Sequence, residues 1–319
     1  MTIVFCSDYS TNPKYGKKPE DRSIDELLSS GFILLDKTFG PTSHQVAAWA
    51  RDMLRLEKLG HGGTLDPFAT GLITLLSGKA VRLSSKVLSH DKSYVAVLKI
   101  HGAHSEDDVR AVLAKLTGKI YNVPPEISAV KVQVRTRTIH RFDLVEMVDN
   151  HVIAHIECES GTYVRTLATD MGLMLDCLVE LKELRRPTSG PFSLKSAVTM
   201  QQLADAYWLW DAKGDDSAML RIVHPIESLL EGFPRLVIKD SAAAALTHGA
   251  PLMRPGLISL ESTAKKDERI LIVTMKGEVV ALANLLVEPS SIATMVTGEV
   301  AKPDLVLMDE GTYPKGWVN

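Results

Sequence analysis

The sequence has few cysteines and no long apolar run, and both absences restrict what it can be. Its three cysteines are an odd number without CxxC spacing, which disfavours a disulfide framework and a zinc site. No segment approaches the roughly 18 consecutive apolar residues of a membrane-spanning helix. Residues 1–23 turn polar too early for a signal peptide. We therefore expect reduced cysteines, no metal, no membrane partner and a cytoplasmic location.

The sequence also lacks an excess of positive charge. Its 36 Lys and Arg residues are outnumbered by 39 Asp and Glu residues, so the formal net charge is −3. This balance gives no overall attraction to nucleic acid, and any nucleic acid must bind a local basic surface, assisted by partners. No repeat or low-complexity tract stands out. A chain of 319 residues that is 45% hydrophobic is typical of a globular protein with about two domains.

The order of strand and helix patterns predicts an extension followed by two domains. Residues 1–31 have little core of their own, so we expect them to pack on the C-terminal domain. Residues 32–230 contain both strand and helix patterns. Trp49 lies in one of the predicted helices and is most simply an anchor in the core. Turns rich in Gly and Pro then introduce residues 235–319, whose short apolar strands predict a compact barrel.

The loop LGHGGTLDPFATG, residues 59–71, places one acidic side chain, Asp66, among apolar and turn-forming residues. Gly62 and Gly63 can adopt backbone angles that other residues avoid, and Pro67 biases Asp66 away from helix. The carboxylate is thereby presented at the apex of the loop. Asp and Pro are also common in ordinary turns, so the spacing alone fits either a reactive carboxylate or a simple turn.

Cations stand at two further places of interest. Arg165 falls in the first turn of a helix that begins near Tyr163, where the helix dipole favours negative charge. This placement indicates a carboxylate or phosphate partner, or else a side chain that reaches solvent. Basic residues also alternate along a predicted strand or stand side by side, which fits either RNA binding or a solvated edge. These residues are Lys131, Arg135, Arg137, Arg185 and Arg186.

Several of these segments together resemble one known family. The chain is similar to the archaeal members of the dyskerin family of pseudouridine synthases, relatives of the bacterial TruB enzymes. The resemblance runs from about Phe32 to Trp317, and the number and order of the motifs carry it, because any one alone is a weak signal. The motifs are GHGGTLDPFATG, SYV, PPEISAVK, SGTYVRTLATDMG, LRRPTSGPF and TYPKGW.

The resemblance implies an α+β fold with a mixed, largely antiparallel sheet in the catalytic domain. A PUA domain, an RNA-binding barrel, would follow in residues 235–319. The nucleophile would be Asp66, which attacks the target uridine; the glycosidic bond breaks, the uracil rotates, and carbon 5 rejoins the ribose. A carboxylate suits this task because it is ionised near neutral pH and can leave again. Neither a metal nor a cofactor is implied.

The resemblance also assigns roles to neighbouring residues. Arg165 would pair with Asp66 and hold it ionised and oriented. Tyr94, in the SYV motif, would stack on the flipped uracil and help remove the carbon 5 proton, although an ordinary tyrosine pKa of about 10 makes a poor base. His61 would occupy the space of the extruded nucleotide. Leu184 would line the uracil pocket, and the five basic residues named above would contact RNA.

Three residues depart from the family pattern, which has proline, arginine and a basic residue at the corresponding positions. They are Thr38, Thr188 and Val132. These departures remove stiffness and charge from the RNA-facing surface, so they bear on RNA affinity more than on activity. The chain also lacks the long Lys-rich tails of eukaryotic members, and a nucleolar address is not supported.

The implied activity is that of an isomerase, an RNA pseudouridine synthase acting on the T-loop of tRNA and, with H/ACA guide RNA, on rRNA during ribosome biogenesis. Its partners in the guided reaction would be a zinc-ribbon-like protein, a glycine-arginine-rich-type protein and a kink-turn-binding protein. A stand-alone tRNA enzyme is one alternative. A non-catalytic RNA-binding scaffold is another, although a scaffold has no evident use for the set of Asp66, Tyr94 and Arg165.

Overall fold

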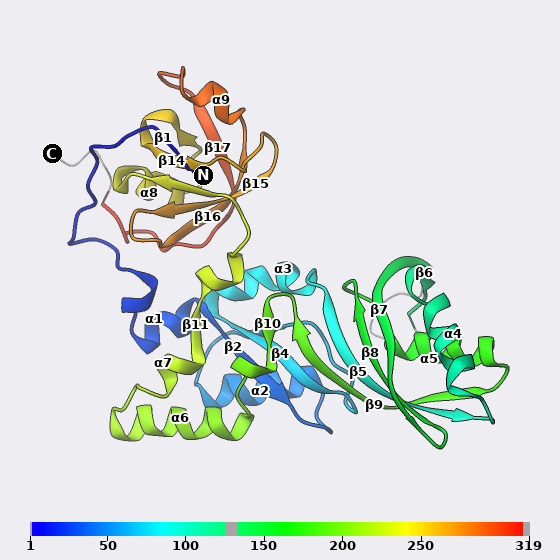
Figure 1. Cartoon of the computed structure of the whole chain (residues 1–319). Helices are drawn as coiled ribbons and strands as arrows, with labels where there is room; N and C mark the ends of the chain where they lie inside the picture. Colours follow the sequence, from blue (N-terminus) through cyan, green and yellow to red (C-terminus); the bar gives the residue numbers. More distant parts are fainter. Residues whose placement is uncertain (1, 125–132, 315–319) are drawn as a thin grey trace. The chain divides into compact units, whose positions relative to one another are not determined.

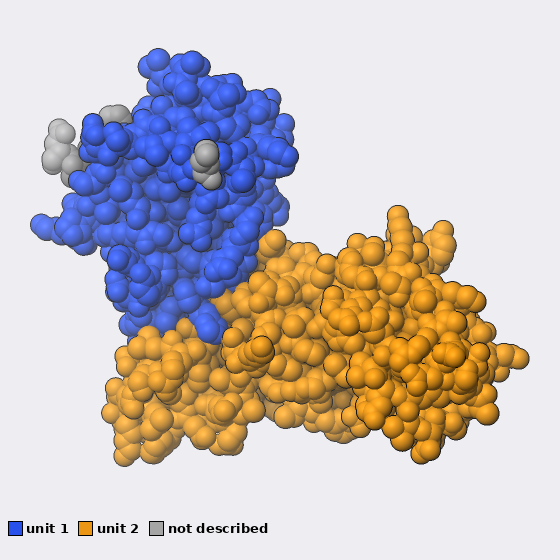
Figure 2. Space-filling model, viewed as in Figure 1, with its two compact units in different colours: residues 1–30, 224–319 blue, residues 31–223 orange. Residues whose placement is uncertain are grey.

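The chain forms two compact units, one of residues 1–30 and 224–319 and the other of residues 31–223 (Figures 1 and 2). The computed structural model describes residues 2–124 and 133–314. Within these ranges, no helix is both long and apolar enough to cross a membrane. The same residues contain no cluster of His, Cys, Asp or Glu side chains arranged to hold a metal ion.

A long mixed sheet forms the centre of the 31–223 unit (Figure 1). Its strands run in the order β2-β4-β9-β5-β8-β7-β6, with β3 paired to β4 and β10 paired to β9. All these neighbours are antiparallel except β4 and β9, which confirms the expected mixed, largely antiparallel sheet. The strands are β2 (Gly31–Lys37), β3 (Leu59–Gly62), β4 (Thr70–Ser77), β5 (Lys92–His101), β6 (Gly118–Asn122), β7 (Arg135–Val148), β8 (His151–Cys158), β9 (Leu178–Ser189) and β10 (Phe192–Ser193).

One face of this sheet is covered by α4 (Glu106–Lys115) and α5 (Val164–Leu175), whose apolar side chains share a core with β5, β7 and β8. Strand β8 alternates, with four apolar residues buried at every second position: Val152, Ala154, Ile156 and Cys158. Helix α4 begins with a capping box, because Ser105 and Asp108 each bond the other's backbone N–H. The alternation and the cap are read correctly from sequence.

The remaining helices of this unit lie away from α4 and α5 (Figure 1). In α2, the buried face is made by Val46, Ala47 and Ala50, whereas Trp49 is 54% exposed. The expectation that Trp49 anchors the core is therefore wrong. The helices are α2 (Ser43–Met53), α3 (Ser84–Leu88), α6 (Met200–Lys213) and α7 (Met219–Ile222), and the short strand β11 (Val223–Pro225) follows.

The other unit is built on a seven-stranded sheet of order β1-β14-β12-β15-β16-β17-β13. Strand β1, at the start of the chain, pairs with β14, so that Thr2 lies opposite Glu261. Strands β15 and β16 form the expected hairpin, with Gly277 at positive φ in its turn. The elements are β1 (Thr2–Val4), α1 (Ile24–Ser29), β12 (Arg235–Ile238), α8 (Asp240–Thr247), β13 (Leu252–Met253), β14 (Leu257–Glu261), β15 (Arg269–Thr274), β16 (Val279–Leu285), α9 (Pro289–Ile292) and β17 (Glu299–Val306).

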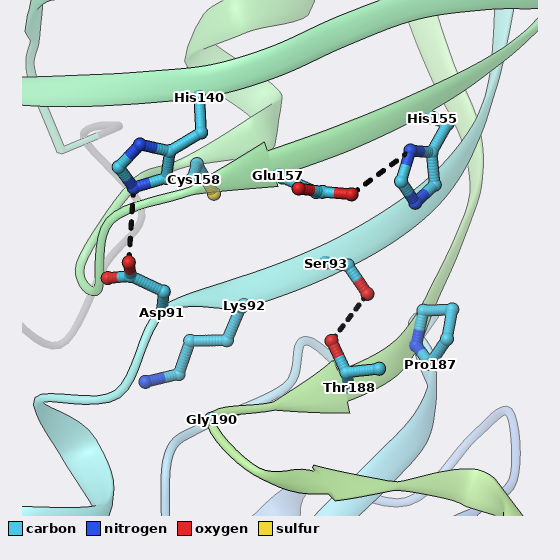
Figure 3. Close-up of a pocket in the computed structure, with 10 residues that line it drawn as sticks. All are labelled: Asp91, Lys92, Ser93, His140, His155, Glu157, Cys158, Pro187, Thr188 and Gly190. Carbon is cyan, nitrogen blue, oxygen red and sulfur yellow. Dashed lines mark hydrogen bonds and ion pairs between the residues drawn. The ribbon is translucent and has the colours of Figure 1, made fainter.

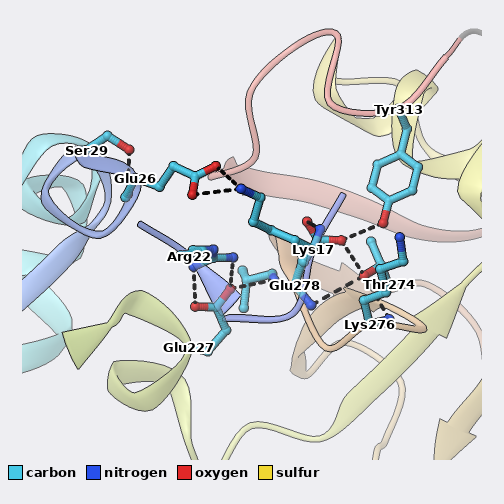
Figure 4. Close-up of polar contacts among 10 residues, drawn as sticks. Lys17, Arg22, Glu26, Ser29, Glu227, Thr274, Lys276, Glu278 and Tyr313 are labelled. Carbon is cyan, nitrogen blue, oxygen red and sulfur yellow. Dashed lines mark hydrogen bonds and ion pairs between the residues drawn. The ribbon is translucent and has the colours of Figure 1, made fainter. Parts of the chain in front are cut away.

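A buried carboxylate ties three distant segments of this unit together (Figure 4). Glu278 is only 4% exposed and accepts hydrogen bonds from the Lys17 backbone N–H at 3.0 Å, the Thr274 hydroxyl at 3.0 Å and the Tyr313 hydroxyl. Nearby, Arg22 and Glu227 form a two-pronged ion pair at 2.8 and 2.7 Å. Residues 1–30 thus belong to the same compact unit as residues 224–319.

Candidate active site

Asp66 lies in the loop that connects β3 to β4, with its side chain one-third exposed. Turn contacts shape the loop on both sides of it. Gly63 has a φ of +103°, and the Ala69 N–H donates to the Asp66 carbonyl at 3.0 Å. The exit glycine, Gly71, has a φ of +110°. The loop therefore uses glycine where the backbone needs a conformation that side chains disfavour.

Arg165 reaches this carboxylate from the first turn of α5. Its Nε lies 3.0 Å from Oδ2 of Asp66, and its Nη2 donates to Oδ1 at 3.1 Å. Such a two-pronged contact fixes the direction of the carboxylate as well as its position. The structure thus brings together the two residues for which sequence gave separate arguments, and Asp66 is the anionic partner that the position of Arg165 called for.

A second segment, residues 37–43, is fastened to the same loop. The Lys37 ammonium, in a side chain 1% exposed, donates to the carbonyls of Asp66 and Pro67 at 3.3 Å and of Ala69 at 2.7 Å. The Ser43 hydroxyl donates to the Leu65 carbonyl at 3.1 Å and accepts its N–H at 2.8 Å. The Asp66 loop is therefore held along its backbone by these two side chains.

Burial of Lys37 lowers the pKa of its ammonium, and the charge of Arg186 acts in the same direction, while the Asp66 carboxylate opposes both. Sequence reasoning missed Lys37 and Ser43 as parts of the site. The available signal was a charged residue at the end of an otherwise apolar strand pattern.

Tyr94 lies in β5 with 8% of its surface exposed. Burial raises the pKa of its hydroxyl, whereas the charge of Arg186 and a hydrogen bond from it act in the opposite direction. The net pKa lies above the ordinary tyrosine value, so the hydroxyl is neutral at pH 7. Tyr94 thus offers an aromatic ring and a neutral hydroxyl. Its ring shares a core with Leu184 of β9 and Leu65 of the loop.

His61 lies in β3, next to the loop, and contacts a second histidine. Its Nε2 is 3.4 Å from Nδ1 of His44, and the ring centroids are 4.7 Å apart in an edge-to-face arrangement. Burial lowers the pKa of His61, and the charges of His44 and Arg186 lower it further. His61 is therefore a neutral ring at pH 7, suited to occupying space and hydrogen bonding and not to carrying charge.

The basic residues expected to bind RNA fall into different environments. Arg135 is exposed and Arg137 is half-buried, while Lys131, like Val132, lies outside the described residues. Arg185 is exposed and forms a two-pronged ion pair with Asp36 at 3.1 and 2.6 Å. These positions leave Arg135, Arg137 and Arg185 accessible to a phosphate.

Arg186 requires a correction, because it is 1% exposed and lies inside the protein. Its Nε donates to the Leu72 carbonyl at 2.8 Å, and its two terminal nitrogens donate to the carbonyls of Gly63 at 3.2 Å and Thr64 at 3.4 Å. The prediction that Arg186 contacts RNA is therefore wrong for this structure. It failed because two adjacent arginines on a strand point to opposite faces, and only Arg185 faces solvent.

A separate pocket of about 630 Å³ lies at the ends of β5, β8 and β9 (Figure 3). The Ser93 and Thr188 hydroxyl oxygens lie 2.6 Å apart across it, and Nε2 of His140 lies 3.1 Å from the Asp91 carboxylate. Thr188, one of the three departures from the family pattern, thus lines this pocket. Asp66, Tyr94 and Arg165 do not line it.

Comparison with known proteins places this geometry in a family. Residues 51–164 match the TruB family pseudouridylate synthase N-terminal domain, and residues 165–231 match the tRNA pseudouridylate synthase B C-terminal domain. Residues 2–47 match the DKCLD domain, and residues 234–307 match the PUA domain. A probable tRNA pseudouridine synthase B from Methanosarcina barkeri is 42% identical over 99% of this chain and 93% of its own length. The chain belongs to the TruB family of pseudouridylate synthases.

This TruB-family chain is also similar to solved structures. One is described as an H/ACA RNP bound to a substrate RNA containing 2′-deoxyuridine, with a TM-score of 0.89, 35% identity, and coverage of 99% of this chain and 97% of that one. Another is a Cbf5-Nop10-Gar1 complex, with a TM-score of 0.87, 37% identity, and coverage of 99% and 96%. The expected dyskerin-type resemblance and the α+β fold followed by a PUA domain are confirmed.

Proposed function

We propose that this TruB-family isomerase converts uridine to pseudouridine in the T-loop of tRNA and, with H/ACA guide RNA, in rRNA. The observation that carries the proposal is the two-pronged ion pair between Asp66 and Arg165, at 3.0 and 3.1 Å. The pair lies in a chain whose relatives are named tRNA pseudouridine synthase B and whose structural neighbours include an H/ACA RNP. A covalent isomerisation needs a carboxylate that is accessible and held in one orientation.

In the proposed reaction, an Asp66 oxygen forms a bond to the target nucleotide and the bond between N1 of uracil and the ribose breaks. The uracil rotates, carbon 5 bonds to the ribose, Asp66 is released, carbon 5 loses its proton, and N1, which kept the electron pair of the broken bond, gains one. Arg165 keeps the carboxylate oriented for attack. Tyr94 packs its ring against the uracil and is the nearest candidate to assist the loss of the proton, although its raised pKa makes the phenolate scarce at neutral pH.

The supporting residues have binding roles in this proposal. His61, neutral and at the edge of the loop, occupies the space that the extruded nucleotide leaves. Leu184, 7% exposed and in the same core as Tyr94, forms the apolar wall of the uracil site. The exposed or half-buried cations Arg135, Arg137 and Arg185 contact phosphates. Lys131 belongs to the same predicted strand face by sequence.

We further propose that residues 32–230 form the catalytic domain and residues 235–319 form the PUA domain with its tail. Residues 1–31 pack on the PUA domain in this scheme. The pairing of β1 with β14 and the bonds from Lys17 and Arg22 support this arrangement. The PUA domain holds guide RNA and leaves the chemistry to the loop of Asp66.

The proposed partners are guide RNA and small protein subunits. One similar structure is named for Nop10 and Gar1 as well as for Cbf5, which supports assembly of this chain with small proteins. The three expected are a zinc-ribbon-like, a glycine-arginine-rich-type and a kink-turn-binding protein. Their association compensates for a net charge of −3. We place the particle in the cytoplasm.

Mapping of pseudouridines tests this proposal. Transcripts of tRNA and of rRNA fragments are incubated with the protein alone, and then with guide RNA and the partner subunits. We expect a pseudouridine in the T-loop, and guided sites in rRNA only when the guide is present. RNA binding without any pseudouridine under either condition would favour the scaffold alternative.

A further inference from the structure

Two buried cations donate hydrogen bonds to the backbone of the Asp66 loop, one near each end of it. Lys37 and Arg186 are each 1% exposed. Arg186 bonds the carbonyls of Gly63 and Thr64, where the loop begins, while Lys37 bonds those of Asp66, Pro67 and Ala69, where it ends. The loop that carries the nucleophile is therefore fixed by charge-assisted hydrogen bonds at both ends.

Arg186 is also anchored through its own backbone. Gly71 lies opposite it in the parallel pairing of β4 with β9. A Cβ atom at Gly71 would lie 2.4 Å from the Arg186 carbonyl oxygen and 2.6 Å from its nitrogen, so only glycine permits this approach. The Nε bond to Leu72 at 2.8 Å then sets the direction of the side chain. The guanidinium is held in one place by β4 and presents its terminal nitrogens to the loop.

Stability alone does not explain a guanidinium at this position. Removing a cation from water is costly, and well-packed apolar residues of similar volume are often neutral or favourable replacements for buried ion pairs. A buried arginine whose bonds go to loop carbonyls is therefore better explained by what it does for the loop. The charge of Arg186 also acts on the Tyr94 hydroxyl, where it lowers the pKa against the larger effect of burial.

We propose that Arg186 is a positioning residue, which fixes the Asp66 loop in one arrangement from inside the protein. It contacts neither RNA nor the reacting atoms. The inference rests on the proposed pseudouridine synthase function, and it deepens that function by assigning a role to a residue that sequence placed on the RNA surface. Arg186 acts on catalysis only through Asp66 and Tyr94.

Ionisable groups also surround the Tyr94 hydroxyl. Three groups act on its hydroxyl: Arg186, Cys158 and Asp66. Burial raises the pKa of Cys158 to about 11, so this thiol stays largely neutral between pH 6 and about 10. Replacing Arg186 with a neutral residue removes the one cation of the three. The ionisation of Tyr94 should then move to higher pH.

The test compares Arg186→Met and Arg186→Lys with the wild-type protein in single-turnover reactions at saturating RNA from pH 6 to 10. We expect Arg186→Met to react about 100-fold more slowly, a loss comparable to that of one preorganised donor. Its RNA affinity should stay within about threefold of wild type. Arg186→Lys retains the charge without the planar fork and should recover at least about tenfold.

Lys92→Met is the matched control. Lys92 is also a buried cation, 6% exposed, but its ammonium donates to the carbonyls of Leu88 and His90, away from the Asp66 loop. Rates are expressed per folded molecule from thermal melts of each variant. If Arg186→Met does not fold, Arg186→Lys carries the test. Its rate should be about tenfold below that of wild type, which is a larger loss than that of Lys92→Met.

Two results would overturn the inference. One is a rate per folded molecule for the Arg186 variants within about threefold of wild type, or no lower than that of Lys92→Met. The other is a rate for Arg186→Lys no higher than that of Arg186→Met, which would show that a cation at this position does nothing for the Asp66 loop. Wild-type turnover in the same reactions separates the two proposals: its absence contradicts the synthase function, whereas its presence with unaffected variants contradicts only the role of Arg186.

Discussion

Arg165 holds both carboxylate oxygens of Asp66, although 99 positions separate the two residues in sequence. The contact joins the first turn of α5 to the loop between β3 and β4. Because both oxygens are engaged, rotation of the Asp66 side chain would break both bonds at once. The carboxylate is therefore oriented before RNA arrives, and part of the entropic cost of reaction is met by folding.

Asp66→Asn should abolish pseudouridine formation while leaving RNA binding largely intact. The amide has nearly the same size and polarity, but it cannot act as the nucleophile. The measurement is single-turnover pseudouridine formation together with RNA affinity. A rate within about tenfold of wild type, equivalent to about 1.4 kcal/mol of barrier, would remove Asp66 from the central role.

Arg165→Met should slow the chemical step by about 100-fold to 1,000-fold, because Asp66 loses the donors that orient it. Arg165→Lys is the matched variant: it keeps the charge but cannot supply two parallel bonds, so we expect an intermediate rate. Single-turnover rates at saturating RNA separate chemistry from binding. If RNA affinity falls in both variants while the saturated rate is unchanged, Arg165 is a phosphate contact.

Gly71→Ala should destabilise the 31–223 unit by about 3 kcal/mol or more, since a Cβ would collide with the Arg186 backbone at a positive φ. Gly118→Ala is the control. Gly118 also has a positive φ, +100°, but nothing lies within 4 Å of its added Cβ, so the loss should be about 1 kcal/mol. Urea unfolding followed by tryptophan fluorescence reports the difference, and equal losses would contradict the close approach of β4 to β9.

Lys92 should make stability depend on pH in an alkaline window. Burial, with the charge of Arg186 next, lowers its pKa to about 8 in the folded protein, against 10.5 as the ordinary value. Between these values the unfolded chain binds more protons at Lys92, so the folded state gains stability as pH rises.

Comparison of wild type with Lys92→Met isolates this effect. Below pH 8 the cost of the buried charge is fully present in wild type. Between pH 8 and 10.5 the free energy of unfolding of wild type should rise relative to that of Lys92→Met by up to about 1.4 kcal/mol per pH unit. Unfolding free energies of both proteins at several pH values measure the gap. A gap independent of pH would mean that Lys92 stays charged throughout.

Guided activity should require partner proteins. With a net charge of −3 and Arg186 buried, the chain offers few phosphate contacts. Each contact contributes about −0.7 to the slope of log affinity against log salt on a single strand and about −0.9 on a duplex. The lone chain should show a shallow slope and slow guided turnover, and both should rise when the partners are added. Equal slopes and equal turnover would show that this subunit suffices.

Local patterns predicted much of the fold and the centre of the site. The alternation in β8, the capping box of α4 and the hairpin at Gly277 follow from neighbouring residues alone. The position of Arg165 in a helix's first turn fitted an anionic partner or a side chain reaching solvent, and Asp66 is that anionic partner. These features depend on short-range sequence or on simple electrostatics, and both are visible without coordinates.

Burial of individual residues was harder to predict. Cations are usually exposed, yet Lys37 and Arg186 are buried because loop carbonyls up to 123 positions away satisfy them. Trp49 lies about 110° around α2 from the centre of its buried face, at 100° per residue, so helical spacing alone misplaced it. In each case tertiary partners decide the outcome, and no local pattern encodes them.

The pairing of β1 with β14 also sets an order for synthesis on the ribosome. Thr2 is made near the start, but its partner Glu261 follows 259 residues later. At roughly 5 to 20 residues per second, β1 waits about 13 to 50 s for its neighbour while the intervening 31–223 unit emerges and can fold. A nascent chain that stalls before β14 carries β1 as an unpaired strand, open to mispairing with other chains. The interval between synthesis of β1 and of β14 is therefore the time in which β1 can mispair, and this interval lengthens as translation slows.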